Sequence, residues 1–218
     1  MGLFRTLHFL NIDTALGAVV FSNFLASILS AQLSIWNDMA LFLCVAIIYN
    51  FDHLNDVRKI EGTPITRRHQ FYKAHSRILQ WFLGVLLLLG LICLPFQSQE
   101  VLQFGFGVIV VVLLYFSLLK LLSIQHIFFK EVMIAIIYAA GVMLAPMVNA
   151  PELLFIDAIW LYVMVALIAL LNLLAFSYYD QEADVKQAHP TIGNFINVKG
   201  FYIAGVLIYS TLIGMIIF

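Results

Sequence analysis

Long apolar runs dominate this chain and constrain its fold more than any other feature. Two of them, residues 101–121 and 155–178, reach the roughly 20 residues that a helix needs to cross a bilayer. Of the 218 residues, 63% are hydrophobic and 11% are charged, whereas an average soluble domain is about half apolar and about a quarter charged. This composition excludes an ordinary soluble globule, a disordered chain and a disulfide-stapled secreted domain. A net charge of −1 gives no general attraction to phosphates, so no nucleic-acid partner is expected.

The apolar runs predict an all-α polytopic membrane protein with about seven transmembrane helices in a single domain, residues 1–218. A β-barrel would instead show alternating segments of about ten residues. The N-terminal run is predicted to be a span, because a cleaved signal peptide has a shorter and cleaner apolar core. The predicted spans cover residues 12–32, 36–55, 79–95, 101–121, 128–148, 155–178 and 200–217.

The charges of the loops are distributed asymmetrically about these spans. All 11 Lys and Arg residues fall on the side that holds the N-terminus and the connections after the second, fourth and sixth spans. The positive-inside rule then predicts a cytoplasmic N-terminus and, after seven spans, a C-terminus outside. The chain size and the compact loops predict a bacterial inner membrane. The charged residues of the opposite side are all acidic, namely Asp38, Glu100, Glu152 and Asp157.

Two aspartate pairs with the spacing DxxxD lie at equivalent ends of the second and sixth predicted spans. They are Asp52 with Asp56 and Asp180 with Asp184. Residues four apart share one face of a helix, and both spans end at the same membrane face. Four converging carboxylates repel one another unless cations neutralise them. Their oxygen atoms suit Mg²⁺, which usually binds through one or two carboxylates together with substrate phosphates. The pattern therefore predicts a diphosphate held between the two pairs by Mg²⁺, with basic loop residues completing the charge balance.

Simpler interpretations of the same residues stay open. A DxxxD pair at a helix end is commonly a solvated charge cluster, and the basic run of residues 58–77 is also typical of a topology signal that touches anionic lipid. The histidines show no metal-binding spacing such as HExxH, so we expect surface or packing roles for them. Cys44 and Cys93 are single cysteines in apolar runs, so we expect two small buried side chains, with neither a disulfide nor a zinc site.

Three stretches resemble the motifs of the UbiA superfamily of intramembrane prenyltransferases. Residues 180–184, DQEAD, resemble the second aspartate motif of the family. Residues 115–120, YFSLLK, resemble its fourth span, in which a tyrosine and a lysine lie near the diphosphate. Residues 52–56 resemble the end of the first motif, NDxxDxxxD, with Ile48 and Tyr49 at the positions of its Asn and first Asp. Family members typically have nine spans, so the chain resembles a divergent, short member.

The resemblance implies both a fold and a reaction. The fold is a ring of helices around a central cavity that opens to the cytoplasmic side. The reaction is the Mg²⁺-dependent transfer of an isoprenoid chain from an allylic diphosphate to an acceptor in the membrane, either an aromatic compound or a lipid. Mg²⁺ and basic residues stabilise the departing diphosphate, while an apolar, phenylalanine-rich interior holds the isoprenoid and excludes water.

The resemblance also assigns roles to individual residues. The catalytic residues and Mg²⁺ ligands are Asp52, Asp56, Asp180 and Asp184. The diphosphate ligands are Arg67, Arg68 and Lys120, and the residues that line the reacting end are Tyr115 and Tyr138. For Asn11 and Asp13 at the first span, an acceptor contact and a helix-start cap are both open, and the cap is the simpler role.

Two other functions compete with catalysis. The altered first motif fits a non-catalytic relative that binds a lipid or an isoprenoid diphosphate without turnover. Paired acids within membrane helices also occur along the ion paths of transporters. A transporter needs polar groups along the depth of the bilayer, however, and the third, fourth and seventh predicted spans offer almost none.

Overall fold

The structure is a computed structural model that describes residues 3–60, 66–121, 127–150, 154–179, 202–203 and 205–211. The regular elements formed by these residues are all helices. They group into two compact units, which we call the first unit (Met1–Leu102 and Ala145–Pro151) and the second unit (Gln103–Leu144 and Glu152–Phe218). The predicted all-α class is therefore confirmed for the described residues, and the single domain stays a prediction.

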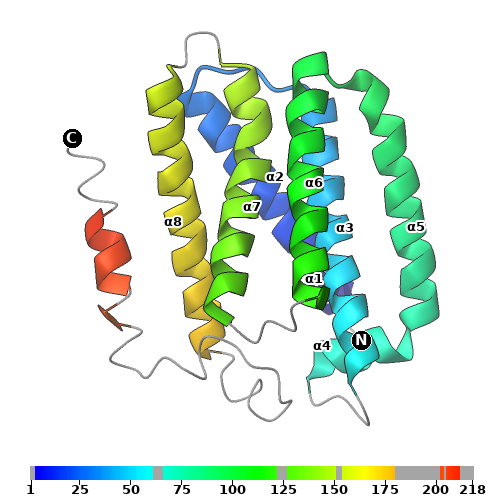
Figure 1. The fold of residues 1–218 in the computed structure, drawn as a ribbon. Helices are drawn as coiled ribbons and strands as arrows, with labels where there is room; N and C mark the ends of the chain where they lie inside the picture. Colours follow the sequence, from blue (N-terminus) through cyan, green and yellow to red (C-terminus); the bar gives the residue numbers. More distant parts are fainter. Residues whose placement is uncertain are drawn as a thin grey trace. The chain divides into compact units, whose positions relative to one another are not determined.

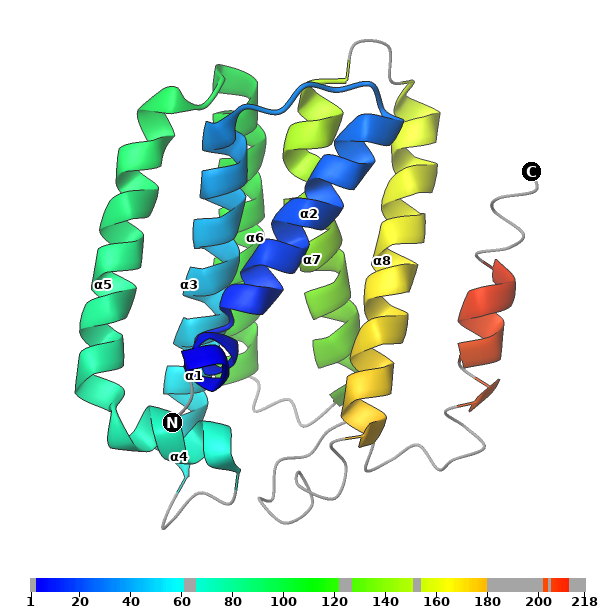
Figure 2. The same ribbon diagram turned by 180° about the vertical axis from the view of Figure 1, so that it is seen from behind.

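The first unit is organised around one long helix, α3. Its described helices are α1 (Leu3–Phe9), α2 (Ile12–Ile28), α3 (Ile35–Lys59), α4 (Arg67–Ala74), α5 (Ser76–Cys93) and the short 3-10 helix η1 (Leu94–Phe96). Helix α3 packs against α2, α4 and α5. Within this unit, α3 and α5 run alongside each other, and α4 lies across their lower end (Figure 1). Helix α2 crosses α3 obliquely, as Figure 2 shows from behind.

A left-handed turn at Asn11 separates α1 from α2. Asn11 has φ 57° and ψ 28°, a conformation that asparagine adopts more readily than most residues. Helix α2 ends at Ile28, and two residues later Ser30 is the second residue with a left-handed backbone conformation. The Ser30 N–H donates to the carbonyl of Ser27. The 17 residues of α2 extend for about 25 Å, less than a hydrocarbon core of about 30 Å. The first predicted span, 12–32, therefore corresponds to a helix shorter than expected.

The apolar core of the first unit lies where α3, α4 and α5 meet. Leu54 and Val57 of α3, Tyr72 of α4 and Leu79 of α5 are buried together. Phe71 of α4 packs against this cluster and is itself partly buried. Removal of these side chains from solvent holds the short, polar helix α4 against the two longer helices.

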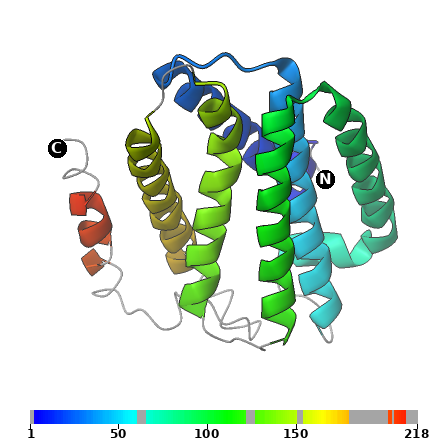
Figure 3. The ribbon, with the colours of Figure 1, turned by 45° about the horizontal axis from the view of Figure 1, so that its top comes forward.

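The second unit holds most of α6 (Gln99–Leu121) and α7 (Ile127–Val148) and all of α8 (Phe155–Tyr179). Helices α7 and α8 lie side by side (Figures 1 and 3), and the Tyr162 hydroxyl of α8 donates to the Ile136 carbonyl of α7 at 2.9 Å. Several buried side chains of these two helices are small, as expected where membrane helices approach closely. They include Ala135, Ala139, Ala158 and Ala169.

Five helices of the described residues are long and apolar enough to cross a membrane. They are Ile35–Arg58, Ser76–Phe96, Gln99–Leu118, Glu131–Val148 and Phe155–Ala175. These helices correspond to the second to sixth predicted spans. Of the seventh predicted span, 200–217, the structure describes only residues 202–203 and 205–211. The count of seven spans and the central cavity stay predictions.

Large apolar side chains remain exposed on these helices, for example Trp81 and Leu88 of α5. Such faces fit contact with lipid better than contact with water. Cys93 is buried, as predicted, but Cys44 is exposed on α3. The predicted burial of Cys44 was wrong because α3 is apolar on its outer face as well as on its packed face.

Candidate functional site

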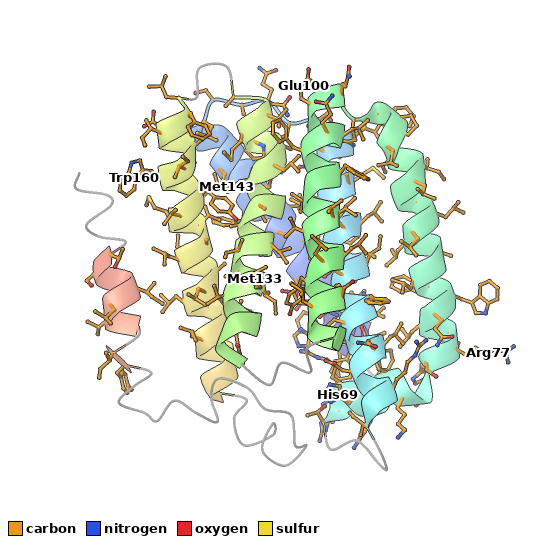
Figure 4. The ribbon with its side chains drawn as sticks, in the orientation of Figure 1. His69, Arg77, Glu100, Met133, Met143 and Trp160 are labelled. Carbon is orange, nitrogen blue, oxygen red and sulfur yellow. The ribbon has the colours of Figure 1, made fainter. Side chains whose placement is uncertain are left out.

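Basic side chains gather at the end of the first unit that contains α4. The set comprises Arg58, Arg67, Arg68, Lys73 and Arg77, at the end of α3, on α4 and at the start of α5. In Figure 4, Arg77 and His69 lie at this end, and Glu100 lies at the opposite end of the unit. Asp38 also lies at the opposite end, in the first turn of α3. The charge asymmetry predicted from the sequence is therefore present within the first unit.

Asp52 and Asp56 lie at the same end as these cations. Helix α3 is continuous from Ile35 to Lys59, so the two carboxylates are four residues apart on one helical face, as the spacing predicted. Both side chains are half-buried. This places a pair of carboxylates at the polar end of an otherwise apolar helix.

Helix α4 has an inner face and an outer face. Its N-cap, Thr66, accepts a hydrogen bond from the His69 N–H at 3.3 Å. On the inner face Tyr72 is completely buried and Arg68 is half-buried, whereas Arg67 and Lys73 are exposed on the outer face. The two arginines predicted to bind one diphosphate thus lie in different surroundings.

His53 connects α3 to the inner face of α4. Its Nε2 atom lies 3.5 Å from Nη1 of Arg68. Its ring meets the Tyr72 ring edge-on, with 5.3 Å between the centroids. His53 directly follows Asp52 in the sequence, so Arg68 contacts the turn of α3 that also carries Asp52. The ring contact with Tyr72 confirms the packing role expected for His53. The contact with Arg68 is a polar interaction that the sequence did not predict.

A buried hydrogen-bond network fixes the position of Tyr72. The Tyr72 hydroxyl lies 2.6 Å from Oδ1 of Asn50, to which it donates, and 3.0 Å from the carbonyl oxygen of Phe9. The Asn50 amide nitrogen donates to the carbonyls of Leu10 and Ala46, at 2.9 and 2.7 Å. Asn50 is only 1% exposed. The network therefore ties the α1–α2 turn, α3 and α4 together inside the first unit.

Asn11 takes part in this network and does not cap α2 with its side chain. It occupies the N-cap position, but its side chain makes no cap hydrogen bond. Its amide nitrogen lies 3.4 Å from the Tyr72 hydroxyl and 3.4 Å from the Phe9 carbonyl oxygen. The capping role expected for Asn11 was wrong, because the left-handed turn directs its amide toward Tyr72. The Asp13 carboxylate pairs with His8 at 2.6 Å.

Burial raises the pKa of the Tyr72 hydroxyl above its ordinary value. The loss of water around a phenolate is the main cause, and the charge of Arg68 and the hydrogen bond from Asn11 act in the opposite direction. Tyr72 therefore remains a neutral hydrogen-bond donor at physiological pH.

The remaining predicted site residues belong to the second unit or lie outside the described residues. Asp180 and Asp184 are outside them, and so is the side chain of Lys120 near the end of α6. Tyr115 is buried on α6 and Tyr138 is half-buried on α7.

Several polar residues of interest were not predicted as site residues. Tyr72 and the buried Glu131 of α7 were missed, and the buried role of Asn50 was not foreseen. The spacing of Tyr72, four residues after Arg68 on α4, is the one sequence signal that could have placed it beside that cation.

Among the described residues, no three His, Cys, Asp or Glu side chains form a group that could hold a metal ion. Comparisons of the chain with protein-family models, with curated proteins and with solved structures found no match. The similarity to the UbiA superfamily therefore rests on motif residues alone.

Replacement of Tyr72 by Phe tests the buried network. The change leaves Oδ1 of Asn50 without its donor, so we expect the free energy of unfolding to fall by about 1–3 kcal/mol. Tyr162→Phe is the matched control, because the Ile136 carbonyl keeps its own helical hydrogen bond, and a loss below about 1 kcal/mol is expected. Unfolding by dodecyl sulfate in mixed micelles, followed by tryptophan fluorescence, measures both. Equal losses for the two variants would contradict the network.

The raised pKa of Tyr72 predicts how stability depends on alkaline pH. The folded state holds the Tyr72 hydroxyl proton more tightly than the unfolded chain does. The hydroxyl therefore makes its full contribution to the free energy of unfolding below the unfolded pKa of about 10. The contribution is lost as the pH rises through the folded pKa. We therefore expect the stability advantage of the parent over Tyr72→Phe to be constant from about pH 7 to 9 and to shrink above about pH 10. Thermal midpoints of both proteins in detergent across this range provide the measurement, and a constant advantage at high pH would refute the shift.

Proposed function

We propose that this chain is a Mg²⁺-dependent, UbiA-like prenyltransferase, which transfers an isoprenoid chain from its allylic diphosphate to an aromatic or lipid acceptor in the membrane. The observation that carries the proposal is the Asp52–Asp56 pair on one face of α3, at the end of the first unit where the cations gather. A polar end on apolar helices suits a substrate with a polyanionic head and an apolar tail.

The aspartate pair fits the metal that the proposal requires. Mg²⁺ is a hard cation that prefers oxygen ligands, and the half-buried carboxylates of Asp52 and Asp56 provide them. In the proposed site, Asp180 and Asp184 supply the second pair. When bound, Mg²⁺ supplies positive charge that offsets the charge of the diphosphate.

The protein's own side chains perform the other tasks in this proposal. Arg68, in contact with His53, binds the diphosphate, and Arg67 and Lys120 contribute further positive charge. Tyr115 and Tyr138 line the reacting end of the isoprenoid. The surrounding apolar side chains exclude water from the allylic group until the acceptor attacks.

The proposal also includes an orientation in the membrane. It has seven spans around a central cavity that opens to the cytoplasm, with the N-terminus inside and the C-terminus outside, in a bacterial inner membrane. The gathering of cations at the α4 end of the first unit, opposite Asp38 and Glu100, supports this orientation.

One observation favours a second candidate, a UbiA-like protein that binds an isoprenoid diphosphate without turnover. Ile48 and Tyr49 occupy the positions where the family's first motif has Asn and Asp. Asn50 lies next to them, but both hydrogens and the oxygen of its side-chain amide already form hydrogen bonds within the buried network. Asn50 is therefore not available as a substitute ligand.

Diphosphate release from allylic diphosphates tests the enzymatic proposal. We expect release by the purified full-length protein to require Mg²⁺ and to fall by about a hundredfold or more in Asp52→Asn and Asp180→Asn, because each change removes a strong electrostatic contact. Asp38→Asn is the matched control on the same helix, and its activity should be unchanged. The experiment measures phosphate with a coupled assay and product by mass spectrometry.

Each outcome of this experiment has one meaning. Activity that is equal in Asp52→Asn and Asp38→Asn would overturn the assigned metal ligands. Mg²⁺-dependent binding of the diphosphate without release, weakened in Asp52→Asn, would replace the enzyme by the non-catalytic binding protein.

A further inference from the structure

The outer surface where α4 joins α5 combines exposed cations with exposed apolar side chains. We call the set Lys73, Arg77 and Trp81 the α4–α5 corner. Lys73 is exposed on α4, and its ammonium donates to the Ile60 carbonyl at 3.2 Å. Arg77, in the first turn of α5, is exposed and points away from the helices in Figure 4.

An apolar line begins beside these cations and continues along α5. Trp81 lies one helical turn after Arg77 and is 74% exposed. The line continues at alternating steps of three and four residues along one helical face. Its members after Trp81, all exposed, are Val85, Leu88 and Ile92. Tryptophan prefers the membrane interface, and a neighbouring arginine extends its charge toward the head groups.

Residues 66–96, which include α4 and α5 and carry these cations, contain no Asp or Glu. Arg68 of α4 turns to the inner face and contacts His53. The structure thus separates Arg68, on the inner face of α4, from the outward cations Lys73 and Arg77.

We propose that the α4–α5 corner binds the phosphate head groups of anionic phospholipids, with the acyl chains along the exposed face of α5. The argument is charge complementarity, because the cations lie at the head-group end of a face that is otherwise apolar. The inference depends on α5 spanning the membrane and is independent of prenyl transfer.

Lipid-specific quenching of a single tryptophan tests the proposal. In the full-length protein, Trp36→Phe and Trp160→Phe leave Trp81 as the only indole. The protein is reconstituted in phosphatidylcholine vesicles with a minor fraction of phosphatidylglycerol, and bromine is placed on the acyl chains of one lipid or the other. We expect brominated phosphatidylglycerol to quench Trp81 more than its mole fraction predicts. The excess should decrease in about 0.5 M salt, which screens the attraction.

Charge-neutralising variants identify the residues that bind. Lys73→Gln and Arg77→Gln should each lower the preference for phosphatidylglycerol by up to about fivefold, and Arg77→Lys should retain it. The matched control is a protein with Trp36→Phe and Trp81→Phe, in which Trp160 of α8 reports. Trp160 is exposed but lies one turn from Asp157 on α8, so no preference for phosphatidylglycerol is expected there.

Three results would overturn the proposal. The first is equal quenching of Trp81 by both lipids, and the second is a preference that neither Gln variant lowers. The third is quenching by neither lipid, which would mean that protein covers this face.

Discussion

The hydrogen bond between Tyr72 and Asn50 is the interaction on which the arrangement of the first unit depends. Both side chains are buried among apolar helices, where an unsatisfied polar group is costly. Tyr72 reaches the Asn50 oxygen only when α4 lies against α3. Asn50 in turn donates to the Leu10 carbonyl, next to the left-handed turn at Asn11. One pair of polar side chains thus fixes both the α1–α2 turn and the placement of α4.

The position of α4 decides what its cations can reach. With Tyr72 held inward, Arg68 lies against His53 of α3, while Lys73 on the opposite face remains at the surface. A free loop of the same composition would present all its cations to water and anionic lipid alike. The helix separates these roles, because residues four apart share a face and residues five apart do not. The two proposals for this unit therefore concern different residues.

The sequence predicted the long helices well and the short ones poorly. The helices α3 and α5 to α8 follow from apolar runs, because a segment in lipid must satisfy its backbone hydrogen bonds internally. The spacing of Asp52 and Asp56 likewise sufficed to place them on one face. The break at Asn11 and helix α4 were not predicted, because they depend on contacts between distant residues. The contact from Asn11 to Tyr72, for example, joins positions 61 residues apart.

The commitment of Asn50 to structure limits which polar groups α3 can contribute to the proposed diphosphate site. A polar residue near the aspartates of α3 is a natural candidate to extend the first motif, yet its amide is used to hold the fold. Helix α3 then offers the carboxylates of Asp52 and Asp56, and Arg68 of α4 contacts the same helix at His53. In the proposed function these carboxylates hold a diphosphate through Mg²⁺, an ion that usually binds through one or two carboxylates together with substrate phosphates. Turnover requires in addition that these contacts strengthen as charge develops on the leaving group. The proposed enzyme and the alternative of a non-catalytic binding protein therefore differ in one physical respect, namely whether the transition state is stabilised more than the bound substrate.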